Sequence, residues 1–314
     1  MKKQLLIAAV AATMASASMA DVSIAGAAKV NYTSVDYDGT TASKNDFTKE
    51  MDLMVKGKSG DTTVVMNFSN DTLSGGLTAE DTYVATSISG VSIKTGAWDN
   101  GNNALRASTR GDNKFAASTA MGGVTITYEA TDESAGKVAD TVKLSGEMAG
   151  VAASYKSVDD GEDISLSTTV SGVKVSYLAL NRDTANEDRS VVTISGEVAG
   201  MGVKIAQADA DSSATISGDS WMGDYEGNTS GAYNLSDGQD VTAIELSTSI
   251  AGNSVKFRNV DIDGVSGEDT SFNKVIITRP LANGTTFEAT YTDLDDAVNA
   301  NDSQTLDLEL AVKF

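Results

Sequence analysis

Residues 306–314, at the end of the chain, read LDLELAVKF and alternate strictly between apolar and polar side chains. A period of two is the pattern of a β-strand with one apolar face, because successive side chains of a strand point to opposite sides of the sheet. The apolar face of this predicted strand comprises Leu306, Leu308, Leu310, Val312 and Phe314.

The same alternation recurs upstream, for example over residues 22–33, 47–56 and 124–129. Two kinds of connection separate the strands. One kind is long and rich in Asp, Asn, Ser, Thr and Gly. The other is short and centred on glycine, which adopts a positive φ at low cost in tight hairpin turns. The short turns fall at Gly60, Gly90, Gly122-Gly123, Gly150, Gly172, Gly200, Gly252 and Asn283-Gly284.

These turns set the number of strands. Eight short turns join sixteen strands, and the first and last strands raise the count to eighteen. Sixteen is the fallback, because residues 83–88 and the interval 200–252 show the alternation weakly. Short turns at one end and long loops at the other are typical of a transmembrane barrel, with periplasmic turns and external loops. The sequence therefore predicts an all-β, antiparallel transmembrane β-barrel.

The first twenty residues have a different pattern. Lys2 and Lys3 precede an apolar stretch from Leu5 to about Ala12, and small residues close the segment at Ala20. This is the form of a secretory signal peptide, and it is too short to span a bilayer as a helix. We predict that residues 1–20 are cleaved and that residues 21–314 form a single barrel domain. Removing the two lysines would make the formal charge of −21 more negative by two.

Composition excludes several chemistries. The chain has no cysteine and no histidine, so zinc sites and Ser-His-Asp hydrolysis are not expected. Its 44 acidic residues against 23 basic ones make nucleic acid an unsuitable partner. No group of carboxylates resembles a catalytic site, so we predict that the protein is not an enzyme and needs no cofactor.

In a barrel of this size the apolar face meets lipid and the polar face encloses water. We expect the lumen-facing side of every strand to carry polar residues along its whole length. Its charged residues are the predicted pore lining, in which opposed acidic and basic clusters discriminate between ions. They are Lys29, Glu50, Asp52, Lys56, Lys94, Glu129, Lys143, Glu147, Lys156, Lys174, Lys204, Glu245, Lys256, Arg258, Glu288, Asp307 and Glu309.

Together, the leader, the strand pattern and the final LDLELAVKF resemble the Gram-negative general porins, the trimeric outer-membrane diffusion porins of proteobacteria. The resemblance covers essentially the whole mature chain. It implies an outer-membrane homotrimer in contact with outer-membrane lipids and lipopolysaccharide. It also implies that the final strand is a signal for the barrel assembly machinery.

A second local match, VSIKTGAWDNGNNALRAS at 91–108, looks like the porin strand that leads into the third external loop. In the family this loop folds into the barrel and narrows it, facing wall lysines such as Lys29 and Lys56. The loop 99–112 would then enter the lumen, although the longer segment 209–239 could narrow the pore instead. The constriction residues that the resemblance implies are Trp98, Asp99, Asn100, Asn102, Asn103, Arg106, Arg110 and Asp112.

Carboxylates crowd the predicted external loops, and hard cations such as calcium take several oxygen ligands. Divalent cations could therefore bind there or bridge to lipopolysaccharide phosphates. No stretch has the complete twelve-residue calcium-loop pattern. The acidic groups are Asp159-Asp160-Gly161-Glu162-Asp163, Asp209 with Asp211, Asp261 with Asp263, and Asp293 with Asp295-Asp296.

The predicted function is a water-filled channel for passive diffusion of small hydrophilic solutes and ions, with a preference for cations because of the negative charge. The alternative is a secreted, acidic surface-layer or adhesive β-protein. The sequence leaves open which solute permeates and whether the channel is general or specific.

Overall fold

We analysed a computed structural model of the chain. It describes residues 21–38, 42–70, 76–100, 104–105, 110–133, 137–184, 187–211, 216–217, 221–222, 232–233, 240–263, 269–295 and 302–314. The predicted signal peptide, residues 1–20, lies outside these ranges. The described part contains no helix long and apolar enough to cross a membrane.

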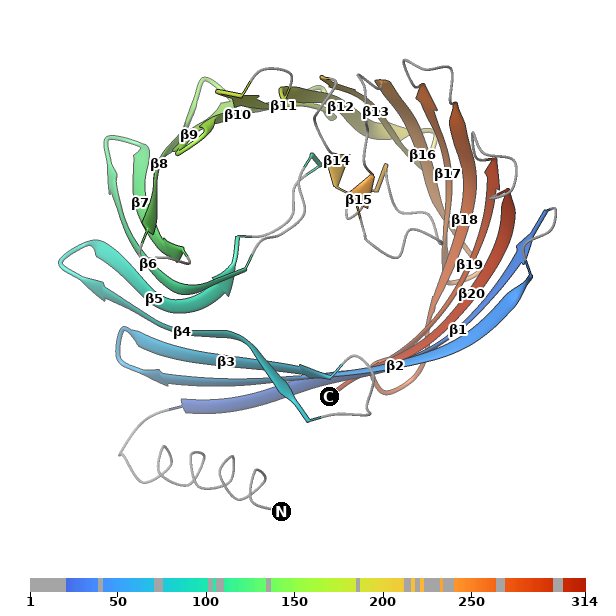
Figure 1. The fold of residues 1–314 in the computed structure, drawn as a ribbon, viewed down its shortest axis with the longest axis horizontal. Coiled ribbons are helices and arrows are strands. Elements are labelled where there is room, and N and C mark those ends of the chain that lie inside the picture. Colours follow the sequence, from blue (N-terminus) through green and yellow to red (C-terminus); the bar gives the residue numbers. More distant parts are fainter. Residues whose placement is uncertain are drawn as a thin grey trace.

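Eighteen antiparallel strands form one closed sheet, because the last strand pairs with the first (Figure 1). The eighteen-stranded, antiparallel prediction is confirmed. In order, the strands are β1(Asp21–Tyr37), β2(Lys44–Ser59), β3(Thr62–Asn70), β4(Thr78–Ile88), β5(Val91–Asp99), β6(Arg110–Met121), β7(Val124–Glu133), β8(Lys137–Met148), β9(Val151–Val158), β10(Gly161–Val170), β11(Val173–Arg182), β12(Arg189–Val198), β13(Met201–Ala210), β16(Asp240–Ile250), β17(Asn253–Asp263), β18(Thr270–Pro280), β19(Thr285–Asp295) and β20(Ser303–Lys313).

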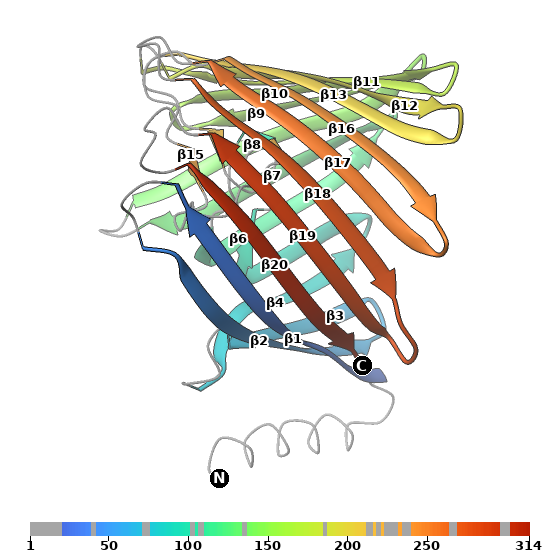
Figure 2. The ribbon, with the colours of Figure 1, turned by 90° about the vertical axis from the view of Figure 1, so that its right-hand side faces the viewer.

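Two further strands, β14(Ile216–Ser217) and β15(Ala232–Tyr233), pair with each other and belong to the connection between β13 and β16. They are drawn inside the ring of the barrel in Figure 1. Seen from the side, the wall strands are strongly tilted and the glycine turns gather at one end (Figure 2).

The turn end is built as the glycine spacing predicts. Ala199 and Gly200, between β12 and β13, have φ values of 53° and 79°. Positive φ at both central residues is the geometry whose twist matches that of the two flanking strands. One connection at the opposite end is shorter than expected, because β10 begins only three residues after β9 ends, at Gly161.

The outer face of the barrel is apolar and exposed. Ile24, Met121, Met148 and Ile250 each expose more than half of their side chain, and all lie near the turn end. Such a band of exposed aliphatic residues has the chemistry of a lipid-facing surface. In a water-soluble sheet the apolar side chains of this face would be buried in a core, whereas here they are exposed on the outside of the barrel.

Part of the inner face departs from the expected pattern. From β11 to β19, the half of the wall near the loops is apolar toward the lumen. The prediction that the inner face is polar along every strand is therefore wrong. These wall residues pack around loop residues Leu105 and Met222, which accounts for their apolar character. The buried cluster contains Leu105, Leu180, Val191, Ala206, Ala208, Ala210, Met222, Val241, Ala243, Val260, Ile262, Phe272 and Leu294.

Candidate functional site in the lumen of the barrel

Alternate side chains of each strand face the lumen, and these include the charged residues. In an antiparallel sheet, directly opposed residues point to the same face, so the register of each pair extends a row across many strands. The structure places all seventeen predicted pore-lining residues, from Lys29 to Glu309, on the inward side of these rows. Whether they contact a permeating solute stays a prediction.

One such row is strongly basic. The register runs from Lys174 on β11 through Ser195, Lys204, Glu245 and Arg258 to Lys274 on β18. We call this row the basic stripe. Its single carboxylate, Glu245, accepts a 2.6 Å hydrogen bond from the Nε of Arg258. The row therefore presents a net positive charge over six neighbouring strands.

The wall from β19 to β2 is acidic instead. Lys29 is bridged to Glu50 at 2.6 Å. Carboxylates of three strands surround this pair, because Glu309 pairs in register with Glu288 and with Asn31. Asp307 and Asp52 lie on the same inward face. Acidic and basic stretches of wall thus lie on different strands of the ring and meet where β18 pairs with β19. That they discriminate between ions stays a prediction.

Trp98 anchors the start of the loop that leaves β5. Trp98 is 5% exposed, and two ammonium groups lie near its ring, with the Nζ of Lys94 at 4.4 Å and that of Lys114 at 4.5 Å from the centroid. Cations over an aromatic face are attracted by the ring quadrupole. A β-bulge between Gly96 and Trp98 interrupts the register here. Gly96 has a φ of 133°, which an L-residue rarely adopts.

Lys114 ties this anchor to the wall. Its ammonium donates to the side-chain oxygen of Asn100 and is bridged to Glu129 at 3.0 Å, with no exposed side-chain surface. A buried charge is tolerated only when paired and hydrogen-bonded. Lys114 and Lys274 are not among the predicted pore-lining residues, although strand parity alone assigns both to the inner face.

Two loop segments meet inside the barrel. Leu105, between β5 and β6, is fully buried in the apolar cluster together with Met222, between β13 and β16. Trp221 packs against that cluster, and the Nζ of Lys204 lies 3.9 Å from its ring centroid. Both stretches that the sequence singled out, 99–112 and 209–239, therefore contribute residues to the lumen.

Of the constriction residues, Trp98, Asp99, Asn100 and Asp112 are described. Trp98 contacts Lys94 and Lys114, whereas Lys29 is paired with Glu50. Asp99 is held through its backbone N–H, which donates to Asp81 at 3.0 Å. The backbone of Arg110 begins β6, and Asn102, Asn103 and Arg106 lie outside the described residues.

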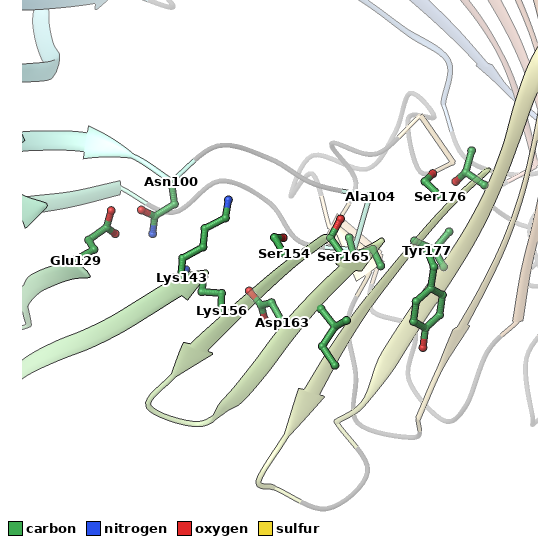
Figure 3. A pocket seen from close by; sticks show the side chains of 14 residues that line it. Asn100, Ala104, Glu129, Lys143, Ser154, Lys156, Asp163, Ser165, Ser176 and Tyr177 are labelled. Carbon is green, nitrogen blue, oxygen red and sulfur yellow. The ribbon is translucent and has the colours of Figure 1, made fainter. Parts of the chain in front are cut away.

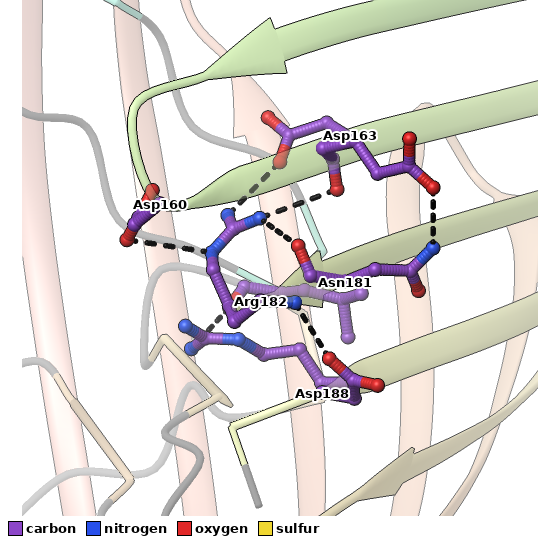
Figure 4. Close-up of polar contacts among 8 residues, drawn as sticks. Asp160, Asp163, Asn181, Arg182 and Asp188 are labelled. Carbon is purple, nitrogen blue, oxygen red and sulfur yellow. Dashed lines mark hydrogen bonds and ion pairs between the residues drawn. The ribbon is translucent and has the colours of Figure 1, made fainter. Parts of the chain in front are cut away.

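The acidic group at the β9–β10 connection has a partner within the protein. Arg182 donates to Asp163 at 2.9 Å and lies 3.8 Å from Asp160 (Figure 4). The same guanidinium also donates to two backbone carbonyls, those of Asn181 and Glu162. Among the described residues, no cluster of three or more acidic side chains has the geometry to hold a metal ion.

The last residue closes the barrel seam. Phe314 and Gly26 exchange two backbone hydrogen bonds, of 2.8 and 3.0 Å, which extend the β20–β1 ladder to the end of the chain. The Phe314 ring lies against Gly26, where a side-chain carbon would come within 2.5 Å of the ring. The outer face of β20 carries Leu306, Leu308, Leu310 and Val312.

No protein-family model matches the chain, and no curated protein sequence matches it. Solved structures do match its fold. The chain superposes on OccAB4 of Acinetobacter baumannii with a TM-score of 0.68 at 10% identity, covering 94% of this chain and 98% of that one. A BenF-like porin of Pseudomonas fluorescens Pf-5 gives 0.67 at 11%, covering 94% and 98%. The anion-selective porin of Comamonas acidovorans gives 0.55 at 11%, covering 94% and 100%. The chain therefore has the fold of the bacterial porin barrels.

Proposed function

We propose that the protein is an outer-membrane porin of a Gram-negative bacterium, a water-filled channel for passive diffusion of small hydrophilic solutes. The observation that carries this proposal is the division of one closed sheet into an exposed apolar outer face and an inner face lined with charged residues. The porin-fold barrels that superpose on the chain support it. No chemical step is required, so we propose a channel rather than an enzyme.

A secreted surface-layer or adhesive protein is less compatible with this structure. Such a protein would expose its apolar outer band to water, and large exposed apolar patches are unfavourable on soluble proteins.

We further propose that the chain is cleaved after Ala20, that it assembles through the Phe314 strand and that it associates into homotrimers. These proposals rest on the sequence pattern and the family resemblance.

Single-channel recording tests the proposal. Protein refolded in detergent should insert into a planar lipid bilayer and produce discrete current steps in KCl. It should also migrate faster on a gel before boiling than after, because a closed barrel resists detergent. Folded protein that shows the mobility shift but gives no current would overturn the channel function.

For small inorganic ions we propose a preference for cations. The acid excess of the chain is concentrated at the loop end, where Asp240 lies in register with both Asp209 and Asp263. Attraction of cations to this end raises their local concentration at the mouth. The basic stripe acts in the opposite sense further inside, and one barrel of the same fold is described as anion-selective. The sign of the reversal potential measured across a KCl gradient distinguishes cation preference from anion preference. An anion preference would refute this proposal.

A further inference from the structure

A recess of about 490 Å³ lies between the loop that follows β5 and the wall of β7 to β12 (Figure 3). Asn100 and Ala104 border it on the loop side. On the wall side, Lys143 and Lys156 lie directly opposite each other on β8 and β9. The inward-facing lining combines ammonium groups, two carboxylates, an amide, hydroxyls and aliphatic groups.

The charge balance of the recess is positive. Its two carboxylates are each bridged to a further cation, Glu129 to Lys114 at 3.0 Å and Asp163 to Arg182 at 2.9 Å. The Lys114 and Arg182 side chains are 0% and 5% exposed, so these bridges are shielded from water. With Asp160, which lies 3.8 Å from the Arg182 guanidinium, included in the count, positive charge exceeds negative charge here by one. Lys156 lies in register with Asp163 on β10 as well as with Lys143 on β8. Like charges directly opposite on neighbouring strands, as at Lys143 and Lys156, are unfavourable, and a bound anion would reduce their repulsion.

The rest of the lining is not that of a site for a bare inorganic ion. Ser154 and Ser165 form the adjacent row on β9 and β10, and Ser176 and Thr193 continue the hydroxyls on β11 and β12. Beyond them the lining becomes apolar. Ala104 and Leu178 pack against the buried lumenal cluster, and Val191 is part of it.

We propose that this recess binds small organic anions that carry an apolar body, as an intermediate station in permeation. The anionic group, a carboxylate, sulfonate or phosphate ester, lies between Lys143 and Lys156. The apolar body lies against Leu178 and Val191, and the serine hydroxyls donate to the remaining oxygens. This inference rests on the proposed channel function and specifies the solute class that the lumen selects.

The test is transient block of single-channel current by probe solutes in KCl. Hexanoate should interrupt the current of the wild-type channel, because both ends of the molecule find complementary groups. Acetate lacks the apolar body, and hexylammonium carries the opposite charge, so both should block far more weakly. Equal block by hexanoate and acetate, or stronger block by hexylammonium, overturns the inference while leaving the channel function intact.

Variants connect the block to the recess. Lys143→Gln should weaken hexanoate block by about tenfold, because a hydrogen bond to a charged group is lost. Lys143→Arg retains the charge and should retain the block. Lys49→Gln is the matched control, since Lys49 lies opposite Val30 on the outer face of the barrel. Undiminished block in Lys143→Gln, with the gel-mobility shift showing folded protein, refutes the site. The absence of any current from the wild-type protein refutes the channel instead.

The apolar end is tested separately. Leu178→Ser should reduce the difference between hexanoate and acetate while leaving acetate block unchanged, because only the longer solute reaches this residue. Leu166→Ser is the control, since Leu166 lies on the outer face of β10. An unchanged hexanoate-to-acetate ratio in Leu178→Ser overturns the assignment of the apolar end.

Discussion

Gly26 is the residue on which the seam between β1 and β20 depends. Its missing side chain leaves room for the Phe314 ring, and its backbone exchanges two hydrogen bonds with Phe314. A glycine inside a strand normally weakens the strand, because the backbone loses more freedom on folding. Here the cost is offset by the contact of the terminal aromatic ring with the strand that begins the barrel.

We expect Gly26→Ala to displace the Phe314 ring and to weaken the seam by about 1–3 kcal/mol, the usual cost of overpacking. The measurement is the urea midpoint of the refolded barrel. Gly196→Ala is the matched control, because the nearest atoms to a side chain there are 3.5 Å away, an ordinary contact distance. Equal effects of the two substitutions would show that the ring contact contributes nothing.

The turn residues carry a smaller, local strain. Ala199 and Ala149 each adopt a φ of 53°, and Ala251 at the same place in its turn has 50°, whereas the equivalent position before Gly284 is asparagine. Asparagine visits the left-handed region more readily than alanine. Ala199→Asn should therefore raise the free energy of unfolding by about 0.5–1 kcal/mol. The reciprocal Asn283→Ala should lower it, and effects of the same sign in both variants would contradict the explanation.

At the scale of elements, the loop after β5 is held at two points. Trp98 contacts the ammonium groups of Lys94 and Lys114, and Leu105 is buried in the apolar cluster of the wall. The wall strands pair with one another independently of either contact. The loop can therefore undock while the barrel stays folded, as is usual for segments that open locally.

Leu105→Ala should weaken docking of this loop by about 2–5 kcal/mol, the range for truncating a buried leucine. We expect faster proteolysis between residues 99 and 112 and a noisier open-channel current. The gel-mobility shift of the barrel should not change. Leu166→Ala, on the outer face of β10, provides the comparison. Loss of the mobility shift in Leu105→Ala would mean that the loop supports the barrel itself.

The sequence predicts the strands well because alternation and turn chemistry are local. It assigns Lys174, Lys204 and Lys256 to one face without knowledge of their neighbours. It could not show that Lys174 and Lys204 belong to one stripe, because the stripe depends on the register of strands. Nor could it foresee that Phe272 and Val260 face inward. A strand that is apolar on both faces is explained only when the loop that packs against its inner face is known.

At the scale of the whole molecule, the net charge and the charge of the lumen differ. The chain carries −21, yet the stripe from Lys174 to Lys274 is basic, and acidic residues concentrate on β19 to β2 and at the loop end. Ions in the lumen respond to these nearby groups more than to distant ones, since the Debye length is about 8 Å at physiological ionic strength.

Charge reversal in and beside the basic stripe should change ion selectivity more than the same charge change elsewhere on the chain. We expect Lys174→Glu, in the stripe, together with Lys256→Glu, which lies beside the stripe on the inward face of β17, to raise the potassium-to-chloride permeability ratio several-fold in dilute KCl. The effect should diminish at 1 M salt, where the Debye length falls to about 3 Å. Lys49→Glu, on the outer face, makes the same kind of charge change away from the lumen. A comparable shift from Lys49→Glu would mean that selectivity follows net charge alone.

The pairing of Phe314 with Gly26 has a topological consequence. The barrel is a ring in which the break between β20 and β1 interrupts no strand pairing, and Phe314 and the start of β1 lie at the same rim. A circular permutant that begins at Gly200, and joins Phe314 to Asp21 through a flexible linker long enough to run past residues 21–25, would preserve every strand pairing. In purified form it should fold to the same barrel in detergent. Under the assembly role that we propose for the Phe314 strand, the permutant should fail to assemble in cells, because it no longer ends in an aromatic residue. The order of the chain would then matter for assembly and not for the stability of the folded barrel.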